Sequence, residues 1–351
     1  MTSRKGKRYL KNLNHDYFNP AFTHVYVEER VLKHWRTKEI LKRLPHARVI
    51  KIQHYKDIFN RKGQDCISQQ KSQSLILAMK EENFFYEGSP LCQSFGNKNF
   101  YYSSSVMNCI YDCSYCYLKG MYPSGHMVVF VNLEDYFHAV SQFLTEKSMY
   151  LCVSYDADLT AVEPLVGYTK AWTEFASKNQ KLKLEIRTKS ARIEMWESLQ
   201  RTENVIYAFT LSPQKLIEQC ERGTPSEEAR IQCAIRGVKK GFFVRLCFDP
   251  MLYLPGWREE YHALLRRLDK ALKEADVCMN DFTDVSVGTF RIAKDYLKKI
   301  RRMEPEEAVV QFPFVTVGGT CQYPPELLEK MEDFFIGELE KRMDREKIYH
   351  E

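Results

Sequence analysis

The sequence predicts an α/β protein built on a partial (β/α)6 barrel of the TIM type, with an N-terminal lead-in and a C-terminal hairpin and helix. Two observations support this fold class. From about residue 100 onward, short β-rich runs alternate with amphipathic helical runs, which is typical of βα units around a parallel sheet. The chain of 351 residues is also long enough for one barrel-sized domain. An open doubly wound sheet is the rival arrangement, and periodicity alone does not separate the two.

The expected elements follow one another in a regular order. Candidate strands lie at 100–105, 149–156, 182–189, 204–212, 242–250 and 281–290. Candidate helices lie near 133–146, 162–178, 190–200, 225–240, 257–275 and 292–303. This pattern divides the chain into a lead-in or cap over 1–99, the barrel over 100–303, and a hairpin with a helix over 304–351. In the lead-in only 30–44 carries a helical signal, and in the last part the hairpin is expected to turn at Gly318 and Gly319.

Composition limits the class of protein. Hydrophobic content of 44% and charged content of 28% are ordinary for a globular protein, and no apolar run approaches the roughly 18 residues of a membrane span. The first fifteen residues lack the apolar core of a signal peptide, so we expect a cytoplasmic protein whose eleven cysteines are thiols or metal ligands. Of the net charge of +6, five positive charges come from a basic tail, made of Arg4, Lys5, Lys7, Arg8 and Lys11. Such a tail suits either non-specific contact with phosphates or a solvated terminus.

Two of the expected strands carry polar residues at every second position. In 182–189 these are Lys183, Glu185, Arg187 and Lys189, and the later strand 242–250 repeats the pattern with Arg245, Cys247 and Asp249. A strand inside a barrel is normally apolar on both faces, so this alternation indicates that polar groups line an interior space. Edge strands with one wet face are the alternative. In barrels of this type, chemistry gathers at the carboxyl ends of the strands.

Three cysteines follow the first expected strand in the spacing CxxxCxxC: Cys109, Cys113 and Cys116. Structural zinc requires four ligands, which would mean recruiting Cys92 or His126, and a redox dithiol would need only two cysteines. Three thiolates suit a 4Fe-4S cluster, because thiolate is the standard ligand of iron in such centres. One iron is then left without a side chain, and an open metal position is where a substrate or cofactor binds.

This cysteine loop, with an aromatic residue after the second and third cysteines, resembles the signature of radical S-adenosylmethionine (SAM) enzymes. That resemblance implies that the open iron holds the amino and carboxylate groups of SAM. It also implies that the reduced cluster cleaves SAM to a 5'-deoxyadenosyl radical, which abstracts a hydrogen atom from the substrate.

A narrower resemblance covers about residues 100 to 303. The segments "CSYCYLKG", "DLTAVEPL", "RTKSARI", "FTLSP", "RGTPSEEARIQCAIRGVKKG" and "FDPMLYLPGWREEYHALLRRLDKAL" are similar to the spore photoproduct lyase family. The resemblance implies a lyase that repairs a thymine dimer, the spore photoproduct, in DNA. The implied cofactors are a 4Fe-4S cluster and SAM, and the implied partners are lesion-bearing DNA and a reductant such as flavodoxin or ferredoxin.

The resemblance also assigns roles to individual residues. Cys109, Cys113 and Cys116 match the cluster ligands. Tyr115 and Tyr117 match two tyrosines beside the cofactor, one of which passes the radical back. Lys189 matches a lysine that pairs with the carboxylate of SAM, and Thr210 matches a serine contact. Asp156 and Asp249 stand where the family has a small hydroxyl residue and an alanine, so either could bind the ribose or the methionine amino group.

The chain departs from the family pattern in two places. The family's hydrogen-atom donor is a cysteine at the end of the second strand, where this chain has Tyr155; Cys152 and Cys247 are alternative donors, or buried structural cysteines. The family's basic hairpin corresponds to a stretch without any Lys or Arg between Met303 and Lys330. Its aromatic residues, Phe312, Phe314 and Tyr323, suit either stacking on an extruded base or completion of a core.

The sequence therefore predicts a radical SAM lyase of the spore photoproduct lyase type. Three other functions remain open at this point: a paralogue acting on a different substrate, a non-catalytic nucleic-acid-binding protein that uses a metal only to fold, and a redox-sensing Fe-S protein.

Overall fold

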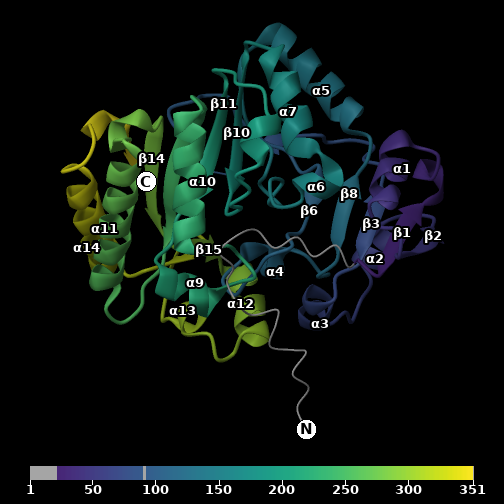
Figure 1. The fold of residues 1–351 in the computed structure, drawn as a ribbon. Helices are drawn as coiled ribbons and strands as arrows, with labels where there is room; N and C mark the ends of the chain where they lie inside the picture. The colour runs from purple at the N-terminus through teal and green to yellow at the C-terminus, as the bar shows by residue number, and fades with distance from the viewer. Residues whose placement is uncertain (1–21, 90–91, 351) are drawn as a thin grey trace.

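The fold is an eight-stranded curled sheet joined to a smaller five-stranded sheet (Figure 1). A computed structural model describes residues 22–89 and 92–350; the basic tail expected at Arg4–Lys11 lies outside the described residues. Among the described residues, no helix is long and apolar enough to cross a membrane.

The large sheet contains the six expected barrel strands in chain order. They are β5 (Phe100–Tyr102), β9 (Met149–Cys152), β10 (Leu182–Thr188), β11 (Val205–Thr210), β13 (Phe243–Met251) and β14 (Asp284–Thr289). Each pairs in parallel with the next. Antiparallel β4 (Tyr86–Glu87) and parallel β18 (Ile348–His350) extend the two edges. Strand order that follows chain order confirms the partial barrel and excludes a doubly wound sheet, in which the order reverses at a switch point.

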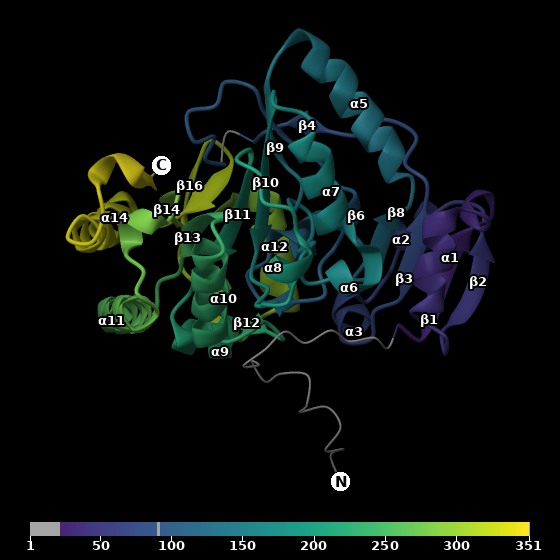
Figure 2. The same ribbon diagram turned by 45° about the horizontal axis from the view of Figure 1, so that its top comes forward.

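Helices cover the outer face of this sheet (Figure 2). They are α5 (Leu133–Glu146), α6 (Glu163–Val166), α7 (Tyr168–Ser177), α8 (Met195–Ser198), α10 (Glu227–Lys239) and α11 (Trp257–Ala275). The bounds expected for α5 and α11 are confirmed. The single helix expected over 162–178 is divided at Gly167, whose φ of +70° is left-handed and ends α6. The helix expected at 190–200 contracts to one turn.

The C-terminal part closes one side of the barrel. Here lie β15 (Arg291–Ala293), α12 (Lys294–Met303), α13 (Ala308–Gln311), the hairpin of β16 (Val315–Val317) and β17 (Thr320–Gln322), α14 (Pro325–Leu339), and the short 3-10 turns η3 (Met279–Asp281) and η4 (Arg345–Lys347). The hairpin turns at Gly318 and Gly319, as expected, with φ of +54° and +84°.

The aromatic residues of the hairpin region pack together. The Tyr323 side chain is fully buried, and its hydroxyl accepts a hydrogen bond from the backbone N–H of Tyr253 at 2.8 Å. Phe312 and Phe314 lie with ring centroids 4.9 and 5.1 Å from that of Tyr323. Of the two interpretations left open by the sequence, the structure supports completion of a core.

The smaller sheet was not expected from the sequence. Its order is β2 (Arg48–Ile52), β1 (His24–Glu28), β3 (Leu75–Ala78), β8 (Met127–Phe130), β6 (Val106–Met107), and all pairs except β6 with β8 are parallel. Strands from the expected lead-in thus share a sheet with strands that follow β5. Three helices belong to this region: α1 (Trp35–Lys42), α2 (Lys56–Phe59) and α3 (Cys66–Lys71), with the 3-10 turn η2 (Glu29–Val31).

Buried charges hold the interior of the barrel together. The side chain of Arg245 on β13 is fully buried and bonds to the carboxylates of Glu185 on β10 and Asp284 on β14. It also donates to the hydroxyl of Tyr150 at 2.7 Å, and its guanidinium lies 3.2 Å from the centroid of the Phe95 ring. Polar alternation in β10 and β13 therefore marks the inner face of a barrel, as expected, and the edge-strand alternative is wrong.

Replacing Arg245 by Met should destabilise the fold by about 3–5 kcal/mol, because the buried carboxylates of Asp284 and Glu185 lose the positive charge of Arg245 and Glu185 keeps only Arg187. The measurement is the free energy of unfolding from a denaturant titration of the apoprotein. Lys270→Met is the control: Lys270 pairs with Glu274 in an exposed pair on α11, and its loss should leave the unfolding midpoint unchanged. An unchanged midpoint for Arg245→Met would contradict the importance of the network.

Candidate active site

A cavity of about 300 Å³ opens at the carboxyl ends of the barrel strands. Its walls include the ends of five strands, through Cys152, Lys189, Thr210, Asp249 and Thr289. The loop that follows β6 faces them and contributes Cys113, Tyr115, Cys116 and Tyr117. Most of the predicted site residues therefore meet in one cavity, since parallel strands end at the same edge of a sheet.

The cysteine loop is held in place from both sides. Cys113 lies in the short strand β7 (Asp112–Cys113), which pairs with β12 (Glu221–Arg222), and α4 (Tyr117–Met121) begins directly after Cys116. On the other side, the side-chain amide nitrogens of Gln70 and Gln73 donate to the carbonyl oxygen of Cys109 at 3.0 and 2.9 Å. The loop is therefore positioned by hydrogen bonds within the apoprotein.

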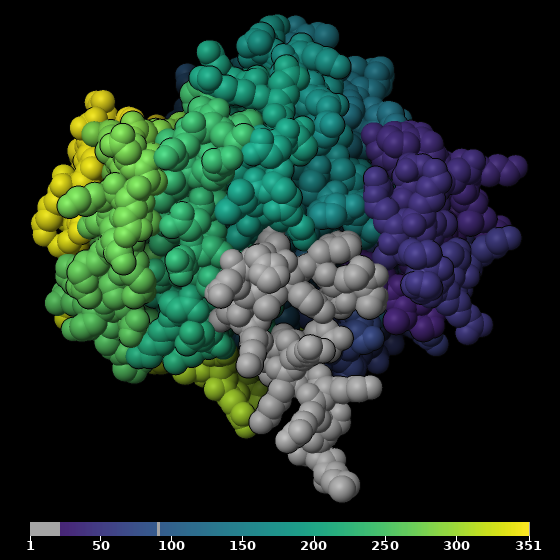
Figure 3. Space-filling view, in the orientation of Figure 1, coloured from purple at the N-terminus to yellow at the C-terminus, as the bar shows by residue number. Residues whose placement is uncertain are grey.

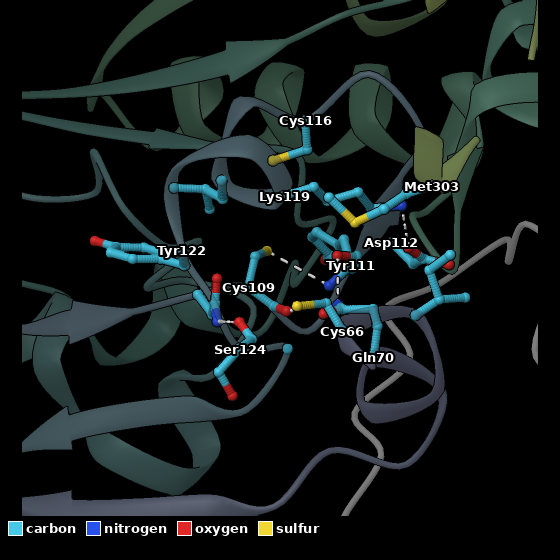
Figure 4. Close-up of a pocket in the computed structure, with 14 residues that line it drawn as sticks. Cys66, Gln70, Cys109, Tyr111, Asp112, Cys116, Lys119, Tyr122, Ser124 and Met303 are labelled. Atoms are coloured by element: carbon cyan, nitrogen blue, oxygen red, sulfur yellow. Dashed lines mark hydrogen bonds and ion pairs between the residues drawn. The ribbon is translucent and has the colours of Figure 1, made fainter. Parts of the chain in front are cut away.

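The three thiols lie around two adjoining cavities. Cys109 and Cys116 line a small cavity beside α3, in which the Cys109 sulfur accepts a hydrogen bond from the backbone N–H of Tyr111 at 3.4 Å (Figure 4). Cys113 and Cys116 line the large one. No three His, Cys, Asp or Glu within the described ranges are close enough to hold a single metal ion. A 4Fe-4S cluster takes one thiolate per iron, so its cysteines surround it and need not meet at a point.

The donor set fits such a cluster. All three cysteines are free thiols, and burial raises the pKa of the Cys113 thiol to about 12, although the ammonium of Lys189 acts in the opposite direction. The alternative zinc ligands make contacts with other residues. Cys92 lies beside Tyr155, and the His126 ring accepts a hydrogen bond from the backbone N–H of Ser74.

Lys189, at the end of β10, sits in a network of buried charges. Its ammonium donates to the Tyr115 hydroxyl at 3.0 Å and lies 3.5 Å from the Glu221 carboxylate. Glu221 is fully buried, pairs with the equally buried Arg230, and accepts hydrogen bonds from the hydroxyls of Tyr115 and Ser212. Burial alone would raise the pKa of Glu221, but Arg230 and Lys189 hold it at about 2. The carboxylate therefore stays ionised.

The backbone of Lys189 is fixed as well. The carboxylate of Asp158 accepts hydrogen bonds from the Lys189 backbone N–H and from the Thr188 hydroxyl, both at 2.7 Å. Asp158 belongs to the loop after β9, so the ends of two neighbouring strands are tied together at the cavity.

A second charged group lies across the cavity. The Asp249 carboxylate lies between the guanidinium groups of Arg187 and Arg291, at 3.5 and 3.4 Å. Arg187 is also bonded to Glu185 at 3.2 Å, which connects this wall to the buried network of Arg245. The Thr210 side chain lines the cavity nearby, and the Thr210 carbonyl oxygen accepts a hydrogen bond from buried Arg230.

Tyrosines form the wall next to the cysteine loop. The Tyr117 hydroxyl donates to the carbonyl oxygen of Tyr155, and the two ring centroids are 5.7 Å apart. The Tyr155 ring stacks on that of Tyr102 at 4.3 Å, and its hydroxyl lies 3.5 Å from the sulfur of Cys92. Tyr155 and Cys92 both line the cavity.

Two residues considered from the sequence, Asp156 and Cys247, do not line the large cavity. Asp156 is buried and accepts hydrogen bonds from the hydroxyls of Ser104 and Tyr122, with the Tyr117 hydroxyl at 3.5 Å; it is not among the residues lining the cavity. Of the alternative donors, Cys152 lines the cavity, whereas fully buried Cys247 does not.

Sequence reasoning missed Glu221, Arg230, Arg291 and Cys92 as site residues. Arg291 directly follows an expected strand, and this was a signal that could have found it. Glu221 and Arg230 give no local signal, because only the fold brings them beneath Lys189.

A curled half barrel whose strand ends face a loop of three cysteines defines the class of radical SAM enzymes. The family model for spore photoproduct lyase matches residues 18–307, which is most of the chain. The chain therefore belongs to the spore photoproduct lyase family.

Individual relatives agree with this assignment. The chain is 24% identical over 244 residues to a spore photoproduct lyase of Clostridium acetobutylicum, covering 67% of this chain and 71% of the relative. It is 20% identical over 258 residues to that of Bacillus subtilis, covering 71% and 73%. A solved spore photoproduct lyase complexed with dinucleoside spore photoproduct shares the fold, with a TM-score of 0.78 at 18% identity over 93% of this chain and 97% of that one.

Glu221→Gln should destabilise the apoprotein by about 3–5 kcal/mol, because Arg230 would remain buried without a counter-charge. A denaturant titration measures the change. Glu197→Gln serves as the control, since Glu197 pairs with Lys240 on the surface and its loss should have no measurable effect. If both variants unfold at the same denaturant concentration, the structural role of Glu221 is wrong.

Proposed function

We propose that this chain is a radical SAM lyase that repairs the spore photoproduct, a thymine dimer, in DNA. The observation that supports this most directly is the meeting of the three-cysteine loop with Lys189 and Tyr115 across one cavity. The relatives named spore photoproduct lyase, and the solved structure holding the dinucleoside lesion, support the choice of substrate.

Cys109, Cys113 and Cys116 would hold the 4Fe-4S cluster, and the adjoining cavity would hold SAM. When bound together, these groups supply a primary carbon radical that abstracts hydrogen from the substrate. The chain's own residues bind and orient the cofactor. The Lys189 ammonium offers a positive charge to a carboxylate, while the Asp249 carboxylate and the Thr210 hydroxyl offer acceptors to an amino group or a ribose.

Asp156 acts on the cofactor site indirectly, through the tyrosines that it contacts. Its carboxylate lies against the hydroxyls of Tyr117 and Tyr122, and it therefore fixes the orientation of the tyrosines that face the cofactor. Tyr115 is oriented in the same way by Glu221 and Lys189.

We further propose that Tyr155 and Cys92 together replace the cysteine that donates a hydrogen atom in the family. A substrate carbon radical would take the hydrogen atom of the S–H or O–H bond, forming a C–H bond and leaving the radical on sulfur or oxygen. The contact between the Cys92 sulfur and the Tyr155 hydroxyl lets a hydrogen atom pass between them. Tyr117, whose ring lies next to Tyr155, would then give its phenolic hydrogen atom to that radical.

The reductant of the cluster would be a flavodoxin or ferredoxin, and the working compartment would be the reducing cytoplasm, in which thiolate ligands persist. The hairpin, which is basic in the family, has no Lys or Arg in this chain. The phosphates of bound DNA would therefore contact cations in another part of the molecule.

The decisive experiment is incubation of the anaerobically reconstituted, reduced protein with SAM and synthetic dinucleoside spore photoproduct. Restored thymines support the proposal. Cleavage of SAM without restored thymines would indicate a paralogue with another substrate. Metal-dependent stability without turnover would indicate a binding or sensing protein.

Lys189→Met should weaken SAM binding roughly 10- to 100-fold while the cluster stays intact, because a charged hydrogen bond contributes about 1.5–3 kcal/mol. Equilibrium binding of SAM gives the affinity, and the visible absorption of the cluster reports its integrity. Lys183→Met is the matched control on the same strand, since Lys183 is exposed and outside the cavity. Equal SAM affinity in both variants would remove Lys189 from the cofactor site.

Tyr155→Phe and Cys92→Ala should each raise the share of by-products formed when product radicals escape, and the double variant should raise it most. Product analysis by mass spectrometry with the dinucleoside substrate measures the share. Cys278→Ala, at an exposed thiol, is the control. Unchanged product ratios in the double variant would exclude this pair and favour Cys152 as the donor.

A further inference from the structure

Residues 22–62, which include α1 and the strands β1 and β2, carry a larger positive charge than the net charge of the whole chain suggests. Residues 22–62 contain eleven Lys and Arg against four Asp and Glu, a net charge of +7, although the whole chain has only +6. With +4 in residues 1–21, the remaining 289 residues sum to −5. The basic tail is thus only part of the basicity, and the larger part lies in a folded region on one flank of the molecule, shown in purple in Figure 3.

Part of this charge lines an open groove of about 560 Å³ between α1 and the start of α7. Lys38, Lys42 and Arg43 line it from α1 and its C-terminal end, and all three side chains are exposed. Glu39 is the acidic residue of this lining, and it is paired with Lys42. The opposite wall is uncharged, with Val166, Gly167 and Ala171.

An exposed tryptophan stands in the same groove. Trp35 is 56% exposed, which is unusual for so large an apolar side chain. Its indole N–H donates to the Glu134 carboxylate at 3.1 Å, and the guanidinium of Arg36 lies 4.3 Å from the ring centroid. Arg36 is itself buried and bonded to Glu134, so the exposed ring is held in one orientation. A fixed aromatic surface beside three cations suits a stack of bases with flanking phosphates.

The groove is connected to the active site through one stretch of chain. Tyr155, which lines the cavity, lies in the loop after β9, and this buried loop leads into α6, whose last residue, Val166, lines the groove. The hairpin offers no cation to a DNA backbone, since no Lys or Arg lies between Met303 and Lys330.

We propose that the groove formed by Trp35, Lys38, Lys42 and Arg43 binds the phosphate backbone of lesion-bearing DNA, with Trp35 stacking on an exposed base. The inference rests on the proposed function for the choice of DNA as the partner. A dinucleoside lesion is too short to reach the groove. The lyase reaction and DNA binding by the groove can therefore be tested separately.

The test measures the affinity of the reconstituted full-length protein for a duplex of about 20 base pairs across a range of salt concentrations. In the triple variant Lys38→Gln, Lys42→Gln, Arg43→Gln, the slope of log affinity against log salt should fall by about 2 to 3, because each lost phosphate contact removes about 0.9. Trp35→Ala should lower the affinity at every salt concentration and leave the slope unchanged. Both variants should retain the wild-type rate on dinucleoside spore photoproduct.

A matched control is Arg266→Gln, Lys270→Gln, Lys273→Gln, three exposed cations of α11 at the opposite side of the molecule (Figure 1). This variant removes the same charge and should keep the wild-type slope. Thermal unfolding shows whether each variant is folded. If the triple variant does not fold, Lys38→Gln alone replaces it, with an expected change in the salt slope of about 0.9.

An unchanged slope in the groove variants, or an equal fall in the α11 control, would overturn the proposal. So would repair of the dinucleoside by a wild-type protein that does not bind the duplex, an outcome that leaves the proposed function intact. Groove-dependent DNA binding without any repair would support the groove and reject the lyase reaction.

Discussion

Charged side chains inside a parallel barrel must neutralise one another, because water does not reach them there. In this chain two groups of buried ions meet that requirement. Arg245 joins Glu185 to Asp284 across three strands, and Glu221 joins Arg230 to Lys189 at the strand ends. A buried ion network adds little to the free energy of folding, because its charges lose their hydration. Removing one member, however, destabilises the fold by about 3–5 kcal/mol, because the partner charge is left buried and unpaired. The two groups of ions therefore fix the positions of the polar groups that face the cavity.

The same constraint explains how the site is organised before any cofactor binds. Lys189 is held by its backbone through Asp158 and by its ammonium through Tyr115 and Glu221. The cysteine loop is held by β12 on one side and by glutamines of the N-terminal region on the other. A binding site that is already ordered loses less conformational entropy when its ligand arrives. The geometry of the site therefore depends on residues that do not line the cavity, such as Asp158 and Glu221.

The departures from the family pattern are explained by the same structure. Where the family places a cysteine, the chain has Tyr155, and the fold brings a thiol to it from a loop more than sixty residues earlier. Where the family has a basic hairpin, the chain has packed aromatic residues, while cations gather around α1. We propose that in both places the chemical group is supplied by a different part of the chain.

Alternating strands and helices in the sequence predicted the βα units and the place of each barrel strand along the chain, although a doubly wound sheet stayed open as the rival arrangement. Polar alternation along a strand and cysteine spacing are local patterns, and the ends of parallel strands gather at one edge, so Lys189 and Asp249 could be placed without coordinates. Thr210 was placed by the family resemblance. The short strands β1 to β3 gave no such signal. Their four or five residues are too few for periodicity to distinguish them from loops.

Contacts between residues that lie far apart in the sequence became known only from the three-dimensional fold. The pairing of Glu221 with Arg230 and Lys189, the contact of Cys92 with Tyr155, and the burial of Asp156 all join segments that are separate in the sequence. Each depends on packing over the whole chain, and packing has no period that a sequence pattern could reveal. The groove of α1 belongs to the same group, because its second wall comes from a segment more than 120 residues later.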